Sequence, residues 1–354
     1  MPVLHYARRS LFLLSLATLT LAGCGKDNGP SEFNPQGASD DMASAQSAFA
    51  SSAAASFAAV GTDISVALGG SAAVASSAQL ALSRPARTER YTRAVTSLFH
   101  SSPAIQASVA AIPTSVAGKT FVYDPATDAY IASELTGAPS NGVRFMLYAV
   151  NPITLRPAEP LNEVGYVDIV DESGSSTSAF HVTVVSNGVT YLDYTASASG
   201  TTNGGVVTVG GYASDGTNRA NFTVESTITQ TTNGIDIGVN YNLRVPSRDF
   251  AITYQATLVT ASQSALQVTV DFTMAGRNGN LSLTGSYSDG GGSFTVKVNG
   301  QTFATVTVTV NGETVLTSAS GNPLTASEET TVRQAVDYYD ASLDLSTTLL
   351  SPLS

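Results

Sequence analysis

Residues 118 to 319 alternate apolar and polar side chains with a period of two, and this alternation limits the fold more than any other feature of the chain. In the clearest example, from Ile235 to Val245, every second residue is apolar and the residues between are Asp, Gly, Asn, Asn and Arg. Such alternation buries one row of side chains and leaves the other in water. The segment therefore predicts strands of an antiparallel sheet with one apolar face.

Turn dipeptides divide this segment at the spacing of β-hairpins. Asn-Gly and Asp-Gly pairs tolerate the positive φ angles that tight hairpin loops need. They are Asn187-Gly188, Asn203-Gly204, Asp215-Gly216, Asn233-Gly234, Asn278-Gly279, Asp289-Gly290, Asn299-Gly300 and Asn311-Gly312. About a dozen or more strands follow, and because neighbours in sequence usually pair, the predicted topology is a meander.

Residues 41 to 117 are rich in Ala and Ser and predict helices. One apolar stripe at helical spacing consists of Phe49, Ala53, Phe57, Val60 and Ile64. The expected signals at its ends are an N-cap at Asp40 or Asp41, interruptions at Gly61 and Gly69-Gly70, and a second helix from Pro85 through Tyr91, Val95 and Leu98. The alternative is partial disorder before Pro85, since Ala and Ser bury little area.

Residues 320 to 354 return to a helical pattern. Thr325 and Glu328 have the spacing of a capping box, and an apolar stripe follows at Val332, Ala335, Val336, Tyr339 and Leu343. A large sheet with one apolar face needs a cover. The predicted fold class is therefore mainly β (α+β): a large curved antiparallel meander sheet or half-barrel, with N-terminal and C-terminal helices covering its apolar face.

The N-terminus has the pattern of an export signal. Arg8 and Arg9 precede a short apolar run from Leu11 to Leu21, and small residues follow. The run is shorter than the roughly 20 residues that span a bilayer. Leu21-Ala22-Gly23-Cys24 resembles the lipobox of bacterial lipoproteins, and Cys24 is the only cysteine in the chain.

This resemblance covers the first 24 residues and implies an address and an anchor. It implies cleavage between Gly23 and Cys24, a diacylglyceryl group on the Cys24 thiol, and often an acyl chain such as palmitate on the new amine. Two or three acyl chains anchor a protein firmly. Gly25 after the cysteine implies, by the rule of enteric-type bacteria, the outer membrane of the cell envelope, facing periplasm or exterior. Residues 1–23 are then the signal peptide and residues 24–40, rich in Gly, Pro, Asn and Asp, a flexible tether.

Charge and composition exclude one class of partner. The precursor carries a net charge of −11, which becomes −13 when Arg8 and Arg9 leave with the signal. An acidic chain without a basic cluster in its sequence is a poor nucleic-acid binder. Without a second cysteine, no intramolecular disulfide forms and stability depends on the core.

Chemical motifs are mostly missing, so neither a catalytic residue nor a cofactor is expected. After processing the histidines are His100 and His181, and His181 fits a structural position in a strand. Gly118-Lys119-Thr120 matches only the end of a phosphate-binding loop, because position 113 is Pro and a strand follows. Asp124 and Asp128 fit a hairpin turn, and Asp168, Asp171 and Glu172 fit a strand end, without the spacing of a calcium loop.

Aromatic residues and one long loop are the candidates for binding. Phe145, Tyr148, Tyr191, Tyr194, Tyr241 and Tyr254 fit either a ligand pocket or the core. Residues 151 to 162 contain three prolines and form the longest irregular connection in the β segment.

Two functional hypotheses from different classes remain. In the first, the lipoprotein binds or carries an apolar ligand, such as a lipid, between sheet and helices. The predicted shape resembles the unclosed barrels of bacterial lipoprotein-carrier and lipid-carrier proteins, without their sequence motifs. In the second, it is a structural or adhesive envelope protein whose Thr-rich outer face contacts polymers or proteins. The first predicts a cavity beyond normal packing, and the second predicts a solid core.

Overall fold

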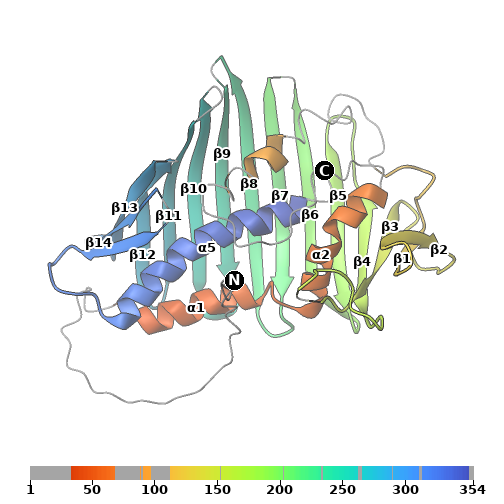
Figure 1. Cartoon of the computed structure of the whole chain (residues 1–354), viewed down its shortest axis with the longest axis horizontal. Helices are drawn as coiled ribbons and strands as arrows, with labels where there is room; N and C mark the ends of the chain where they lie inside the picture. Colours follow the sequence, from red (N-terminus) through yellow and green to blue (C-terminus); the bar gives the residue numbers. More distant parts are fainter. Residues whose placement is uncertain are drawn as a thin grey trace, which may run out of the picture.

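The computed structural model describes residues 33–67, 88, 91–96, 112–151, 153–201, 203–232, 234–261, 265–288, 290–310 and 313–350. Its main body is one open sheet of 15 strands, with helices packed on one face (Figure 1). The predicted fold class, a large curved antiparallel sheet with N-terminal and C-terminal helices on its apolar face, is confirmed.

The strands have these bounds: β1 (Thr120–Asp124), β2 (Ala129–Ser133), β3 (Gly142–Tyr148), β4 (Glu163–Asp171), β5 (Ser178–Ser186), β6 (Val189–Thr201), β7 (Gly204–Ser214), β8 (Arg219–Thr231), β9 (Gly234–Val245), β10 (Phe250–Ala261), β11 (Ala265–Gly276), β12 (Gly279–Ser288), β13 (Gly291–Val298), β14 (Gln301–Val308) and β15 (Thr314–Ser318). The helices are α1 (Pro35–Ser47), α2 (Ser52–Ala67), the short η2 (Pro246–Arg248) and α5 (Ala326–Leu350). Residues 91–96 are also helical.

The meander prediction holds from β3 to β15, where each strand pairs antiparallel with the next in sequence. One edge departs from it, because β1 pairs in parallel with β3, and β2 forms the outermost strand beyond β1. Two-residue turns set the antiparallel register. At Asn187-Gly188 and Asn299-Gly300 both residues have positive φ, the conformation that makes Asn-Gly favourable there.

Helix α1 begins earlier than the sequence patterns indicated. The expected N-cap at Asp40 or Asp41 is wrong, since both residues lie inside α1 and residues 35–40 of the predicted tether are helical. Asn34 is the N-cap: its side-chain oxygen accepts a hydrogen bond of 3.0 Å from the Gly37 amide, and Pro35 supplies the fixed φ of a first helical turn.

Helix α2 also differs from the predicted pattern at two positions. Phe49 lies in the turn between α1 and α2 and not on one continuous helix, and α2 runs through Gly61 without interruption. The rest of the predicted stripe, from Ala53 through Phe57 to Ile64, is buried against the sheet as expected. Gly69-Gly70, Pro85 and Leu98 lie outside the described residues.

Helix α5 agrees with its prediction in detail. The Glu328 carboxylate accepts a 2.7 Å hydrogen bond from the Thr325 amide, and the Thr325 hydroxyl accepts one of 3.3 Å from the Glu328 amide, so the capping box is confirmed. Val332, Ala335, Val336, Tyr339 and Leu343 are all buried. Figure 1 shows α5 crossing the sheet diagonally, while α1 runs across one end of the strands.

A layer of hydroxyl groups joins the helices to the apolar face of the sheet. Tyr241 and Tyr254 stack with ring centroids 4.8 Å apart on β9 and β10. The Tyr241 hydroxyl lies 3.0 Å from that of Tyr338, and Ser342 donates a 3.0 Å hydrogen bond to Tyr254. Burial raises the pKa of Tyr241 and Tyr254 well above the ordinary tyrosine value, so both stay neutral. These bonds fix α5 on the middle of the sheet.

The connection from α1 to α2 is held by Asp215 in the β7–β8 turn. Its carboxylate accepts a 3.0 Å hydrogen bond from the Ser47 hydroxyl and others from the amides of Thr217 and Asn218. Burial alone would raise the pKa of Asp215, but these hydrogen bonds outweigh it and lower the pKa to about 2. Asp215 therefore stays ionised at any physiological pH, and through it the β7–β8 turn anchors the end of α1.

Candidate functional site

The face of the sheet opposite the helices carries rows of polar side chains. The hairpin register aligns Glu225, Asn240, Gln255 and Asp271 across β8 to β11 in one row. A second row on the same strands contains Thr223, Asn242, Thr253 and Thr273. Seven of these eight side chains are exposed, and Thr273 is half-buried.

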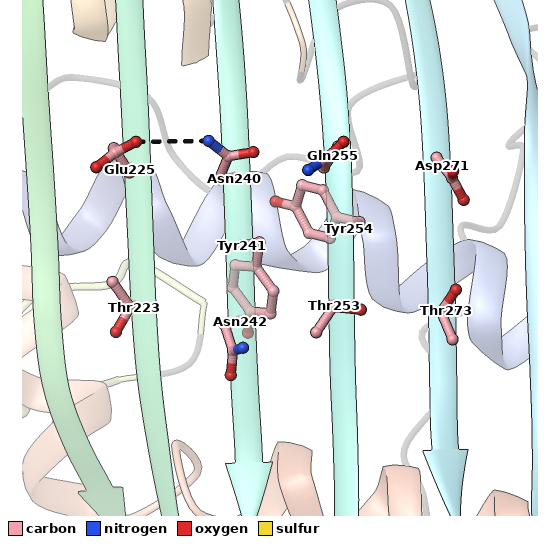
Figure 2. A pocket seen from close by; sticks show the side chains of 10 residues that line it. All are labelled: Thr223, Glu225, Asn240, Tyr241, Asn242, Thr253, Tyr254, Gln255, Asp271 and Thr273. Atoms are coloured by element: carbon pink, nitrogen blue, oxygen red, sulfur yellow. Dashed lines mark hydrogen bonds between the residues drawn. The ribbon is translucent and has the colours of Figure 1, made fainter.

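These two rows line a shallow, open depression of about 640 Å³ on the outer face, called the outer hollow from here on. Figure 2 shows the two rows across β8 to β11. Tyr241 and Tyr254 also border it, but both side chains are buried and hydrogen-bonded to α5. The surface offered to a ligand is therefore made of hydroxyl, amide and carboxylate groups.

The polar groups of the outer hollow are only weakly engaged with each other. Asn240 donates a hydrogen bond of 3.4 Å to the Glu225 carboxylate, and Thr284 donates one of 3.5 Å to Asp271. Both lengths lie beyond the usual range for an N–H···O or O–H···O bond. The carboxylates stand at the two ends of the row, three strands apart, so they do not form a pair for acid and base catalysis. The arrangement suits recognition of a polar ligand.

The inner face is occupied by the chain itself. Helices α1, α2 and α5 and residues 91–96 bury its apolar rows, and fully buried side chains include Phe57, Phe145 and Phe272. Of the aromatic residues proposed from sequence, Phe145, Tyr148, Tyr194, Tyr241 and Tyr254 belong to this buried layer. Tyr191 is half-buried and packs against the core cluster.

His181 occupies a structural position. Its Nε2 lies 2.8 Å from the Asp193 carboxylate on the neighbouring strand, and its Nδ1 lies 3.6 Å from Glu172. Asp168 forms a two-point ion pair with Arg144, with both N···O distances 2.7 Å. Asp171 accepts hydrogen bonds from the backbone amides of Ile112 and Ser173. Each of these polar groups is therefore engaged with protein partners.

The remaining sequence candidates are turns and a loop. Asp124 and Asp128 flank the β1–β2 turn, as expected, and Arg156 of the long loop pairs with Asp128 at 3.4 Å and with Asp63 at 2.9 Å. Thr120 begins strand β1, so Gly118-Lys119-Thr120 does not open a helix. His100, Gly23 and Cys24 lie outside the described residues.

Apart from Tyr241 and Tyr254, the residues of the outer hollow were not predicted from the sequence. Each is an ordinary outward position in an alternating strand, and only the cross-strand register brings Asn240 and Gln255 beside each other. The available signal was chemical: these outward positions carry Asn, Gln, Asp and Glu among many Thr residues.

No protein-family model, curated protein or solved structure matches this chain. Among the described residues, no helix is long and apolar enough to cross a bilayer. The same residues contain no group of three or more His, Cys, Asp or Glu side chains placed to hold a metal ion.

Proposed function

We propose that this chain is an exported lipoprotein, anchored through Cys24, whose outer sheet face binds a polyhydroxylated polymer of the cell envelope. The observation that carries the proposal is the contrast between the two faces. The inner face is covered by helices through buried hydroxyl contacts, whereas the outer hollow is open and lined by polar side chains. A structural or adhesive role fits this contrast better than carriage of an apolar ligand.

The spacing of the rows suits a repeating ligand. Neighbouring strands lie about 4.8 Å apart, so each row presents a polar group at regular intervals. A glycan chain offers hydroxyl and N-acetyl groups that can bond to Asn240, Asn242 and Gln255. Each bond contributes only about 1 kcal/mol net, so affinity would come from several contacts at once.

Binding to peptidoglycan sacculi tests this proposal. The double substitution Asn240→Ala with Gln255→Ala removes two adjacent amides from the hollow. We expect at least about a fivefold weaker co-sedimentation of the mature chain, because two hydrogen bonds of roughly 0.5–1.5 kcal/mol are lost. The matched control is Gln267→Ala with Gln301→Ala, which removes two exposed amides from β11 and β14 outside the hollow.

The control separates the amides of the hollow from exposed amides elsewhere on the sheet. An unchanged control beside a weakened hollow variant supports the proposal. If the unsubstituted chain does not sediment with sacculi, or if both variants bind alike, the assigned ligand or the assigned site is wrong. Circular dichroism of both variants checks that the sheet is intact.

A second candidate, carriage of a lipid, is favoured by one observation. The hydroxyls of Ser56 on α2 and Tyr194 on β6 are buried and have no hydrogen-bond partner in the part of the chain that the structure describes. An unpaired buried hydroxyl costs about 1–3 kcal/mol, which a polar ligand group or water would offset. Phe57 contacts the Tyr194 ring, with ring centroids 6.4 Å apart, so any such ligand would lie beneath α2.

Mass measurement decides between the two candidates. If the protein carries a lipid, residues 25–354 purified without the anchor will show a native mass above that of the denatured chain, and organic solvent will extract the difference. Equal masses, with no uptake of added phospholipid, would remove the carrier candidate. The Tyr194→Phe variant is the internal check, because it deletes the buried hydroxyl while keeping the ring. If that hydroxyl binds the lipid, the variant should show less excess native mass than the unsubstituted chain.

A further inference from the structure

The cationic side chains of β8 to β13 gather at one end of the sheet. Arg219 begins β8, Arg244 is the last residue but one of β9, Arg248 lies in the β9–β10 turn, Arg277 in the β11–β12 turn, and Lys297 near the end of β13. In a meander, all of these points lie at the same end of the strands. These five residues are called the basic edge. They are half of the ten Lys and Arg residues that the structure describes.

The opposite end of the sheet carries acidic side chains. Asp236 lies near the start of β9 and Glu313 lies in the β14–β15 turn. The described residues in 201–204, 229–236, 259–267, 288–291 and 309–314 include no Lys or Arg. Charge is therefore separated along the strand direction, although the mature chain as a whole is acidic.

The acidic groups at the basic edge are largely engaged. Asp41 is buried, receives a 2.6 Å hydrogen bond from Asn278 and lies 3.6 Å from Arg248. Asp215 accepts hydrogen bonds from its own turn and from Ser47. Asp40 and Asp249 are the exposed carboxylates there.

The cations are more available than these carboxylates. Arg244, Arg277 and Lys297 are exposed and have no ion-pair partner among the described residues. Arg219 is also exposed, with its guanidinium 3.6 Å from the centre of the Tyr212 ring. Hydrogen bonds from neutral groups leave the charge of Asp215 in place. The described residues of this end therefore hold the five cations against the carboxylates of Asp40, Asp41, Asp215 and Asp249, a small positive excess.

The expected anchor joins the protein at this end. Asn34 donates a 2.9 Å backbone hydrogen bond to Asn278 in the β11–β12 turn, beside Arg277. Cys24 precedes Phe33 by nine residues. Nine residues span at most about 30 Å, so lipid on Cys24 would keep the turn at Asn278 within about that distance of the bilayer.

We propose that the basic edge faces the phosphate groups of an anionic lipid bilayer, so that the sheet stands on the membrane with its acidic end away from it. The proposal rests on the lipid anchor of the proposed function. Attraction acts only within about 8–10 Å at physiological ionic strength, which makes the nearest groups count more than the net charge of the whole chain. The outer hollow, in the middle of the strands, would then face sideways and remain open to envelope polymers.

Vesicle binding without the lipid tests the edge by itself. The probe is the mature chain with Cys24→Ser, sedimented at low ionic strength with phosphatidylcholine vesicles that contain phosphatidylglycerol. The basic-edge variant is Arg244→Gln with Lys297→Gln. The matched control, Lys119→Gln with Arg333→Gln, removes the same two charge types from exposed positions outside the basic edge.

We expect the basic-edge variant to partition onto the vesicles about tenfold more weakly and the control to change less than twofold. The reason is that each cation near an anionic surface raises the partition coefficient severalfold. Binding should also be lost in about 0.5 M NaCl, where screening is strong. Equal loss in both variants, or equal binding to vesicles of phosphatidylcholine alone, would overturn the proposal.

A separate measurement tests the anchor. Cells that express the full chain are labelled with radioactive palmitate, and the label is compared between the unsubstituted chain and Cys24→Ser. If labelling depends on Cys24 but the basic-edge variant binds vesicles as well as the unsubstituted chain, the lipid anchor is supported and the role of the basic edge is rejected. If the basic-edge variant binds vesicles more weakly but no palmitate label is found, the role of the basic edge is supported and the lipid anchor is rejected.

Discussion

Gly211→Ala should destabilise the protein by roughly 3 kcal/mol, because the sheet has no room for a methyl group at this position. A Cβ at Gly211 in β7 would overlap the backbone of Asp193 and Tyr194 on β6. The absent side chain also lets Tyr194 and Phe222, on the strands either side, come together with ring centroids 6.3 Å apart. Urea denaturation followed by circular dichroism measures the free energy of unfolding.

The same sheet supplies the control for this prediction. Gly238 in β9 has nothing within 4 Å of a built Cβ. Gly238→Ala should therefore be neutral or stabilise by up to about 1 kcal/mol, since alanine reduces the entropy of the unfolded chain. Similar urea midpoints for Gly211→Ala and Gly238→Ala would show that the strand packing around Gly211 is wrong.

Leu343→Asp should abolish the close packing of α5 on the sheet, at a cost of at least about 4 kcal/mol. Leu343 is fully buried on the apolar stripe of α5. A carboxylate there would lose its hydration without a partner, and the lost leucine would leave a cavity. Thermal unfolding and binding of a dye for exposed apolar surface measure the two consequences.

An exposed neighbour on the same helix serves as the control. Ala341→Asp adds the same charge two residues away, on the outer side of α5. We expect it to cost only about 1 kcal/mol, from the lower helix propensity of Asp and its repulsion by Asp337 one turn earlier. If the two aspartates were tolerated equally, α5 would not cover the apolar face as the structure places it.

Local sequence rules predicted most of the fold because the meander is built from local contacts. The alternation from Ile235 to Val245 matches the buried and exposed rows of β9, and the Thr325 and Glu328 pair closes the capping box. Both depend on residues close in sequence, and here the prediction and the structure agree.

The errors arose where distant segments decide the outcome. The start of α1 was hidden by the polar residues around Gly37, although Asn34-Pro35 has the pattern of an N-cap followed by proline. Gly37 is required there because the Asn278 side chain, far along the chain, packs against it. The parallel pairing of β1 with β3 likewise depends on tertiary contact and has no local signal.

The outer hollow was beyond local rules for a related reason. Its rows join residues from four hairpin-connected strands, and a shift of one residue in any turn would send Asn240 or Gln255 to the other face. The anchor at Cys24 depends on sequence recognition by export enzymes and stays a prediction.

The position of α5 at the end of the chain has a consequence for biogenesis. In the exported chain that we propose, the meander can form as the strands emerge, because from β4 on every strand pairs with the strand before it. The part of the apolar face that α5 covers, however, stays open until residues 326–350 arrive, and α1 gains its contacts with α5, including Ser39 with Gln334 at 2.6 Å, only then. During that interval the emerging chain exposes a hydrophobic surface, and we expect a holding chaperone to protect it from aggregation.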